Sequence, residues 1–326
     1  MNLIKLFDSL VLPDKTGKYL NSITVPNFTN FRIAIDAEGK SHLLLLISKK
    51  IHDLNLKNYK LKYLQLEQNL DCRIYEKNSF ITQTFTVISF HSVDRNLLEY
   101  FLRISETLIN TIGEKPTQKQ VVESLNRFIE VFKSLSEIPT KTISGLWSEL
   151  FLIETSNDPL VLINFWHNYP EEKFDFNSGN EKIEVKSSSN FERKHFFSAE
   201  QLIPQKDSKI IIASMYLKQH YSGLNIQNLI ERIATKIDFN NESLDKINVV
   251  VFRTLGNSFQ QSFEVKFDYN IALQSLQFYL QEDIGKISRD CIPVNVSDVK
   301  FKSDLSRINS IELMKISEKQ ILFKAL

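Results

Sequence analysis

The chain has 326 residues and a mass of 38.0 kDa, which is room for one large domain or two ordinary ones. Its 42% hydrophobic and 24% charged residues are typical of a globular protein, and its low content of glycine and proline, eight of each, excludes collagen-like and linker-rich chains. Two cysteines exclude a disulfide framework and a thiolate zinc cluster, and a net charge of +1 provides no overall positive field to attract nucleic acid.

The hydrophobic segments are short. The longest aliphatic run covers residues 43–47, far fewer than the ~20 residues of a membrane helix. Near the N-terminus, Asp8 interrupts the apolar stretch that a signal peptide needs. We therefore expect a soluble, cytoplasmic protein that makes no membrane contact.

The first part of the chain alternates between apolar and polar side chains, as strands do. Residues 31–36 and 42–48 are the predicted arms of a hairpin, with turn-forming residues between them. Further strands are expected over 59–66, 72–75 and 80–90. These patterns predict a β-rich N-terminal domain.

The spacing of apolar residues then changes to three and four, which is typical of amphipathic helices. One helix is expected from Asp94 to Gly113, a second from Thr117, and a third over 143–154. Residues 113–116, Gly-Glu-Lys-Pro, resemble a linker. We therefore predict a β-rich domain with a trailing helix over residues 1–115 and a second domain over residues 116–326.

Short strands and helices alternate in the second domain. Strands are expected over 173–176 and 182–186, joined by an Asn-Ser-Gly-Asn turn. A short helix is expected from Ser198 to Pro204, a buried strand over 209–217, and a helix around 229–237. Three more strands are predicted over 263–268, 271–280 and 292–299.

The candidate chemistry lies in the predicted hairpin over 173–186. A metal-dependent phosphodiesterase needs hard oxygen ligands for Mg²⁺ and a cation near the attacked phosphate. Asp175 and Glu184 lie on either side of the turn, and Lys186 projects from the same face of its strand as Glu184. Glu149, on the preceding helix, can be presented to the same sheet.

The same residues also fit an ion pair at an exposed strand edge. Acid-x-Lys occurs repeatedly in this chain, and Glu264-Val265-Lys266 repeats the letters of Glu184-Val185-Lys186. Only the Glu184 copy has an aspartate across a tight turn. The residues alone leave both interpretations open.

The motifs at 145–150, 174–176, 183–187 and 195–202, with Trp166 between the first two, follow one another as in a known family. The sequence resembles the bacterial PD-(D/E)XK-motif proteins of the restriction-endonuclease-like superfamily. This resemblance implies an α/β (α+β) core, with a central mixed sheet flanked by helices, behind a β-rich N-terminal domain. Phe174 replaces the proline of the motif, and Ser148 and His167 replace two expected glycines.

The resemblance also implies a function. It assigns Asp175, Glu184 and the main-chain carbonyl of Val185 as ligands of Mg²⁺, for which Mn²⁺ can substitute. Lys186 would lie beside the scissile phosphate, and Glu149 would complete the acidic set. We expect Mg²⁺-dependent hydrolysis of phosphodiester bonds in DNA, in a bacterial restriction or phage-defence setting with partner proteins. A catalytically silent DNA-binding or assembly module is the alternative.

Several polar residues are candidate DNA contacts. Ser198 and Gln201 either bind phosphate at a helix start or form a capping box. Arg193 and Lys194 lie just before them. Residues 49–62 contain five lysines and one aspartate, so Lys57, Lys60 and Lys62 either follow a DNA backbone or are solvated loop residues.

Overall fold

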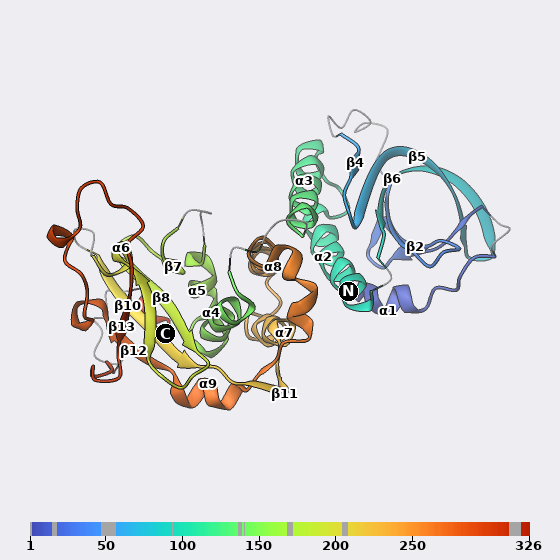
Figure 1. Cartoon of the computed structure of the whole chain (residues 1–326). Helices are drawn as coiled ribbons and strands as arrows, with labels where there is room; N and C mark the ends of the chain where they lie inside the picture. The colour runs from blue at the N-terminus through green and yellow to red at the C-terminus, as the bar shows by residue number, and fades with distance from the viewer. Residues whose placement is uncertain are drawn as a thin grey trace. The chain divides into compact units, whose positions relative to one another are not determined.

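The computed structural model describes residues 2–14, 18–46, 57–92, 94–135, 139, 141–167, 172–203, 208–312 and 321–326. The chain divides into two compact units, Met1–Ile138 and Pro139–Leu326 (Figure 1). We predicted the boundary after residue 115, whereas this division follows Ile138. The difference is one helix, α3 (Gln118–Ser134), whose aromatic residues pack against α2 (Arg95–Ile112) within the N-terminal unit.

The N-terminal unit contains a six-stranded sheet with strand order β1-β2-β3-β6-β5-β4, in which β1 also pairs with β5. The predicted hairpin is confirmed as the antiparallel pair β2–β3, and the strands expected after it are β4, β5 and β6. The strands are β1 (Leu20–Val25), β2 (Phe28–Ile35), β3 (Ser41–Leu45), β4 (Tyr59–Lys60), β5 (Leu64–Glu76) and β6 (Ser79–Phe90).

Helix α2 begins and ends where the sequence predicts, and α3 begins at the predicted Thr117. The Asp94 side chain caps α2 by accepting from the backbone N–H of Leu97, and Gly113 ends the helix with a φ of 70°. The Phe101 ring of α2 stacks on Phe90 of β6 at a centroid distance of 4.8 Å. This aromatic contact fixes α2 on the sheet. A short helix, α1 (Leu3–Asp8), precedes the first strand.

The C-terminal unit contains a four-stranded sheet with strand order β12-β10-β8-β7. Strands β8 and β10 are parallel, and the other two neighbouring pairs are antiparallel. This is the mixed sheet of the predicted fold class. The strands are β7 (Phe176–Asn177), β8 (Glu181–Ser188), β10 (Lys209–Tyr216) and β12 (Gln277–Leu280), with β9 (Lys194–Ser198) and β13 (Lys300–Asp304) forming a separate ribbon and β11 (Gln219–Leu224) following β10.

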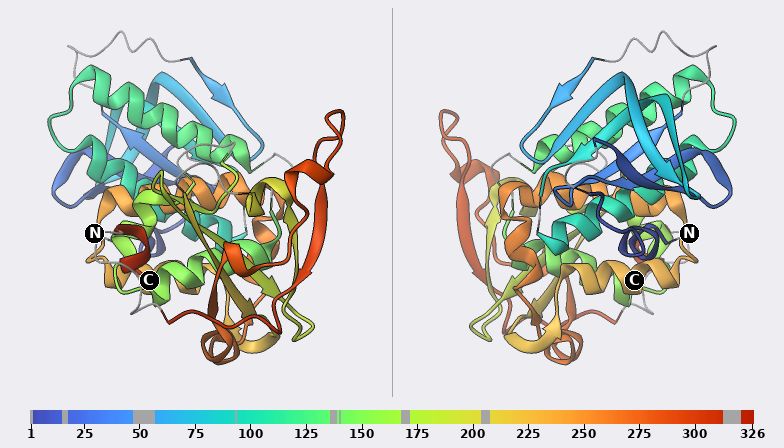
Figure 2. Two further views of the ribbon diagram at one scale, coloured as in Figure 1. Left: turned by 90° about the vertical axis from the view of Figure 1, so that its left-hand side faces the viewer. Right: turned by 90° about the vertical axis from the view of Figure 1, so that its right-hand side faces the viewer.

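Helix α4 and the β9–β13 ribbon lie on different sides of this sheet (Figure 1). Ile210 and Ile212 of β10 pack with Phe197 of β9 and with Leu305 in one buried cluster. The segment 285–299 leads to β13 along the outside of the unit (Figure 2). The helices are α4 (Ile143–Thr155), α5 (Pro159–Phe165), α6 (Ala199–Leu202), α7 (Ile226–Lys236), α8 (Asn241–Leu255), α9 (Tyr269–Ser275) and α10 (Ile321–Lys324), with 3₁₀ turns η2 (Gly256–Ser258), η3 (Gln260–Phe263), η4 (Gln281–Asp283) and η5 (Arg289–Cys291).

Two strand predictions near the C-terminus are wrong, and a third is correct only over its last four residues. The region 263–268 begins at the end of η3 and makes only isolated β-bridges, at Phe267, and 292–299 is an exposed connection. The region 271–280 is divided between α9 and the shorter β12, because the Asp268 side chain accepts from the backbone N–H groups of Asn270 and Ile271 and starts a helix there. Among the described residues, no helix is long and apolar enough to span a bilayer.

Candidate functional site

The β7–β8 hairpin brings two predicted carboxylates to one level of the sheet. Phe176 pairs with Ile183, so Asp175, just before Phe176, and Glu184, just after Ile183, are adjacent across the hairpin. Glu184 also has a parallel neighbour in β10, Ile212. The local turn and the sheet register together place these two acids.

Asp175, Glu184 and Glu149 are buried, with exposed fractions of 4%, 5% and 2%. The Asp175 Oδ2 atom accepts a 2.7 Å hydrogen bond from the backbone N–H of Val185. The Glu149 Oε2 atom, on α4, accepts a 2.8 Å hydrogen bond from the indole N–H of Trp166. Buried acids are therefore held in place by a strand backbone and by a core side chain.

Lys186 and Glu184 lie on the same face of β8, two residues apart. The Lys186 Nζ atom pairs with Oε1 of Glu184 at 2.7 Å and lies 5.2 Å from the centre of the Phe197 ring. The other oxygen of Glu184, Oε2, is buried and has no hydrogen-bond partner among the described residues. A buried carboxylate oxygen without a partner is costly, so it marks a place for a further ligand.

Two residues that sequence reasoning did not place in the site complete the cluster. Lys141 Nζ lies 2.6 Å from Glu149 Oε1 and also pairs with Asp175 Oδ1. His167 Nε2 lies 2.8 Å from Glu149 Oε2. One ligand atom each from Glu149, His167 and Asp175 lie within 4.8 Å of one another, so these three form a possible metal-binding group.

The sequence carries only a weak signal for these two residues. Lys141 itself belongs to no helix or strand and lies two residues before the helix that carries Glu149. His167 stands where the resemblance led us to expect glycine, and its φ of 41° lies in the left-handed region that glycine favours. The local sequence signal for a role of His167 in the site is therefore that histidine replaces a glycine expected at this position.

The pKa values of the two buried glutamates move in opposite directions. Burial raises the pKa of Glu184 to about 7, and the Asp175 charge adds to this effect against the opposing charge of Lys186. For Glu149, burial by itself raises the pKa, but Lys141 and His167 outweigh it and lower the pKa to about 2. The cationic neighbours of Glu149 therefore favour its anion, whereas burial and the Asp175 charge disfavour the anion of Glu184.

Among the predicted DNA contacts near the site, Arg193 points inward, which corrects our expectation. Its guanidinium is buried and donates 2.9 Å hydrogen bonds to the backbone carbonyl and the hydroxyl of Ser214, because it packs between Tyr216 and Tyr279. Lys194 is exposed and pairs with Glu192 at 3.2 Å.

Gln201 is engaged by the protein itself. Its Oε1 atom accepts from the backbone N–H of Ser198 at 3.1 Å, which is the capping interaction, and its Nε2 atom donates to Glu184 Oε1 at 2.6 Å. The side chain therefore links the start of α6 to the carboxylate. This use of both polar atoms favours the capping alternative over direct phosphate binding.

The lysine-rich residues 49–62 belong to the N-terminal unit. Lys57, Lys60 and Lys62 are exposed, and the Lys62 amine lies 4.6 Å from the centre of the Tyr63 ring. Lys49 and Lys50 lie outside the described residues.

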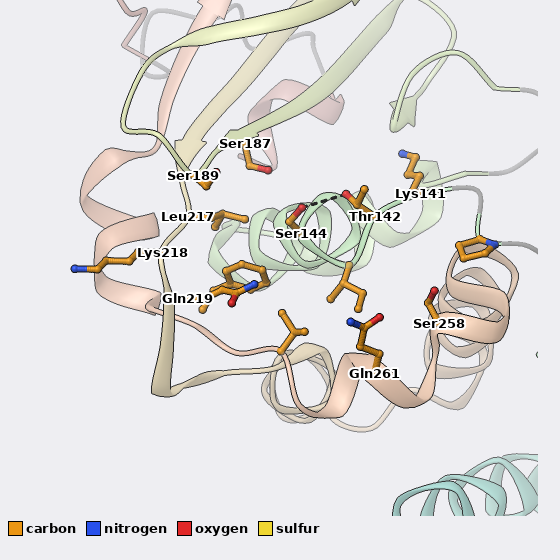
Figure 3. Close-up of a pocket in the computed structure, with 14 residues that line it drawn as sticks. Lys141, Thr142, Ser144, Ser187, Ser189, Leu217, Lys218, Gln219, Ser258 and Gln261 are labelled. Atoms are coloured by element: carbon orange, nitrogen blue, oxygen red, sulfur yellow. Dashed lines mark hydrogen bonds between the residues drawn. The ribbon is translucent and has the colours of Figure 1, made fainter.

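A cavity of about 950 Å³ opens beside Lys141 (Figure 3). Ser187 and Ser189, at the end of β8, face Ser258 and Gln261 across it, with the start of α4 between them. Its lining comes from four parts of the C-terminal unit: Pro139, Lys141, Thr142, Ile143 and Ser144; Ser187 and Ser189; Leu217, Lys218 and Gln219; and Ser258, Gln261, Val265 and Phe267. Among these described residues none is acidic, two are lysines, and hydroxyl groups are frequent.

Comparison with known protein families identifies the family of this chain. The model of a family described as "Putative PD-(D/E)XK family member, (DUF4420)" matches residues 3–306, which is nearly the whole chain. No curated protein and no solved structure shows significant similarity to the chain.

Proposed function

The chain belongs to this PD-(D/E)XK family, and we propose that it is a divalent-metal-dependent nuclease that hydrolyses phosphodiester bonds in DNA. The observation that supports this most directly is the unpartnered Oε2 atom of Glu184, which is buried next to Asp175 and on the same strand as Lys186. A structural ion pair at a strand edge would be exposed and would leave no buried oxygen without a partner.

The donor set fits a hard cation. Asp175, Glu184 and the main-chain carbonyl of Val185 would hold Mg²⁺, with Mn²⁺ as a substitute, because all three offer oxygen atoms. When bound, the ion would polarise the phosphate and make a water molecule more acidic. The backbone N–H of Val185 already faces Asp175, so this part of β8 and the Asp175 carboxylate lie together.

Residues of the chain would orient the metal ligands and stabilise negative charge on the phosphate. The Lys186 ammonium, kept beside Glu184 and over Phe197, would stabilise negative charge that builds on the phosphate. Gln201 fixes the orientation of Glu184 through its amide. Glu149 completes the set of buried carboxylates at the site.

The cavity beside the site supports a nucleic-acid substrate. Hydroxyl, amide and ammonium groups are the usual partners of phosphate oxygens, and acidic side chains would repel them. The described lining residues provide the first kind and none of the second. A role in bacterial restriction or phage defence, with partner proteins that select the target, is part of this proposal.

The test is a cleavage assay on linear, supercoiled and single-stranded DNA with Mg²⁺ or Mn²⁺. We expect cleavage that EDTA abolishes and that Glu184→Gln loses, while Glu264→Gln, in the exposed copy of the same tripeptide, keeps it. DNA binding by the wild type with no cleavage of any substrate would instead favour the silent DNA-binding module.

A further inference from the structure

The Lys141 amine contacts every member of the carboxylate–imidazole group. It lies 2.6 Å from Glu149 Oε1 and 3.2 Å from His167 Nε2, and it pairs with Asp175 Oδ1. The ligand atoms of the same three residues lie within 4.8 Å of one another. This is close to the separation of two ligands on opposite sides of one ion, at ~2.0–2.3 Å each. The amine therefore stands where an ion would bind.

The Lys141 ammonium and a divalent ion cannot occupy the position between Glu149, His167 and Asp175 together. Glu149 and Asp175 are almost completely buried, and two buried carboxylates require a positive charge beside them. Lys141 supplies that charge through a side chain that is only 31% exposed. A divalent ion would need the same oxygen atoms, so the amine and the ion compete.

The imidazole of His167 determines which metal ions suit this position. A residue with a Cβ atom is disfavoured at a φ of 41°, yet the backbone N–H of His167 bonds to the Asp175 carbonyl at 3.2 Å and keeps the imidazole here. Ca²⁺ and Mg²⁺ prefer oxygen ligands alone, whereas transition-metal ions accept an imidazole nitrogen, so Mn²⁺, which also takes carboxylate ligands, is the ion used to probe this position.

We propose that Lys141 is a built-in cation that fills a second ion position formed by Glu149, His167 and Asp175. The inference rests on the proposed metal site at Asp175 and Glu184, with which it shares Asp175. In the wild-type chain the amine restricts the cluster to one divalent ion. A neutral side chain at position 141 opens the second position to Mn²⁺.

The experiment measures Mn²⁺ binding to the full chain by calorimetry and by electron paramagnetic resonance, without DNA. We expect one ion per chain for the wild type and for Lys141→Arg, which keeps the charge, and two ions for Lys141→Met. The metal-free Lys141→Met protein should also melt at a lower temperature than the wild type and recover more on addition of Mn²⁺. Lys141→Gln, whose amide can donate to both carboxylates, is the second neutral variant in case Lys141→Met does not fold.

Further substitutions identify the ions. In the Lys141→Met background, Glu149→Gln should remove the additional ion, and Glu184→Gln should remove the other one. An additional ion that depends on Glu149 upholds the inference even where Glu184→Gln removes none, a pattern that would count against the proposed catalytic metal site. Two ions in the wild type, or no additional ion in either neutral variant, would overturn the inference.

Discussion

The side-chain amide of Gln201 donates a 2.6 Å hydrogen bond to Oε1 of Glu184. The same oxygen pairs with Lys186, so both neighbours of this carboxylate use one oxygen and leave the other without a partner. The start of α6 thereby fixes which way the carboxylate of β8 faces.

Gln201→Ala should therefore weaken the site without removing a ligand. Loss of a hydrogen bond that orients a metal ligand typically costs ~10–100-fold in metal affinity or activity. Ser198→Ala is the matched control, because it keeps the backbone N–H that bonds to Gln201. Mn²⁺ affinity and cleavage rate are measured for both; equal losses in the two variants would show that helix capping alone is responsible.

Glu184→Gln should stabilise the metal-free protein at pH 8 but not at pH 5. The folded-state pKa of Glu184, about 7, lies above its ordinary value of 4.5, because burial disfavours the anion. The folded state thus binds the proton more tightly, and the stability contributed by this group is lost as the pH rises through about 7, with a slope of up to ~1.4 kcal/mol per pH unit. Urea unfolding in EDTA at both pH values measures this. Glu264→Gln, at an exposed position, should change neither value, and an equal gain at pH 5 would contradict the explanation.

His195 should give the opposite dependence. Burial lowers its pKa to about 4, with Lys186, Arg193 and Lys302 adding to the effect, below the ordinary 6.5. The unfolded state then binds the proton more tightly, so stability falls as the pH drops from about 6.5 to about 4. His195→Gln, which can still bond to the Ser214 hydroxyl, should flatten this part of the curve. An unchanged curve in metal-free protein would show that His195 binds its proton equally tightly in the folded and unfolded states, which would contradict the lowered pKa.

Reversal of Lys57, Lys60 and Lys62 to glutamate should weaken DNA binding similarly for unrelated sequences, because contacts to phosphate carry no base information. The slope of log affinity against log salt should flatten by ~1 for each phosphate that the variant no longer neutralises. Single-turnover cleavage at saturating DNA should persist, since no proposed metal ligand is changed. Reversal of the exposed basic residues of α3 is the control, and an unchanged salt slope would assign Lys57, Lys60 and Lys62 to solvent.

Local signals account for what the sequence predicts correctly. Asp94 and Thr117 are caps whose bonding partners lie three residues away, and the hairpin that carries Asp175 and Glu184 closes through a four-residue turn. Such features depend on neighbours in the chain, so spacing and residue type reveal them. The same reasoning placed a strand where Asp268 starts α9, because the apolar alternation there outweighed a capping signal.

Contacts between distant segments account for what the sequence does not predict. Lys141 pairs with Asp175, which lies far away in the sequence, and no pattern of residue spacing predicts contact between the two. The pairing of β9 with β13 joins strands that are about a hundred residues apart in the sequence, and no local pattern indicates which distant strands pair. Helix α8 was also missed, although Asn240 caps it in the ordinary way.

The pairing of Phe197 with Phe301 has a consequence for the order in which parts of the candidate site form during synthesis. Phe197 supports Lys186, yet its strand partner leaves the ribosome long after the acidic residues do. A nascent chain in which Asp175 and Glu184 have been synthesised therefore still lacks the strand that holds Phe197 beneath Lys186. We expect Lys186 to reach its final position over Phe197 only after residues 300–304 have been synthesised and have paired with β9.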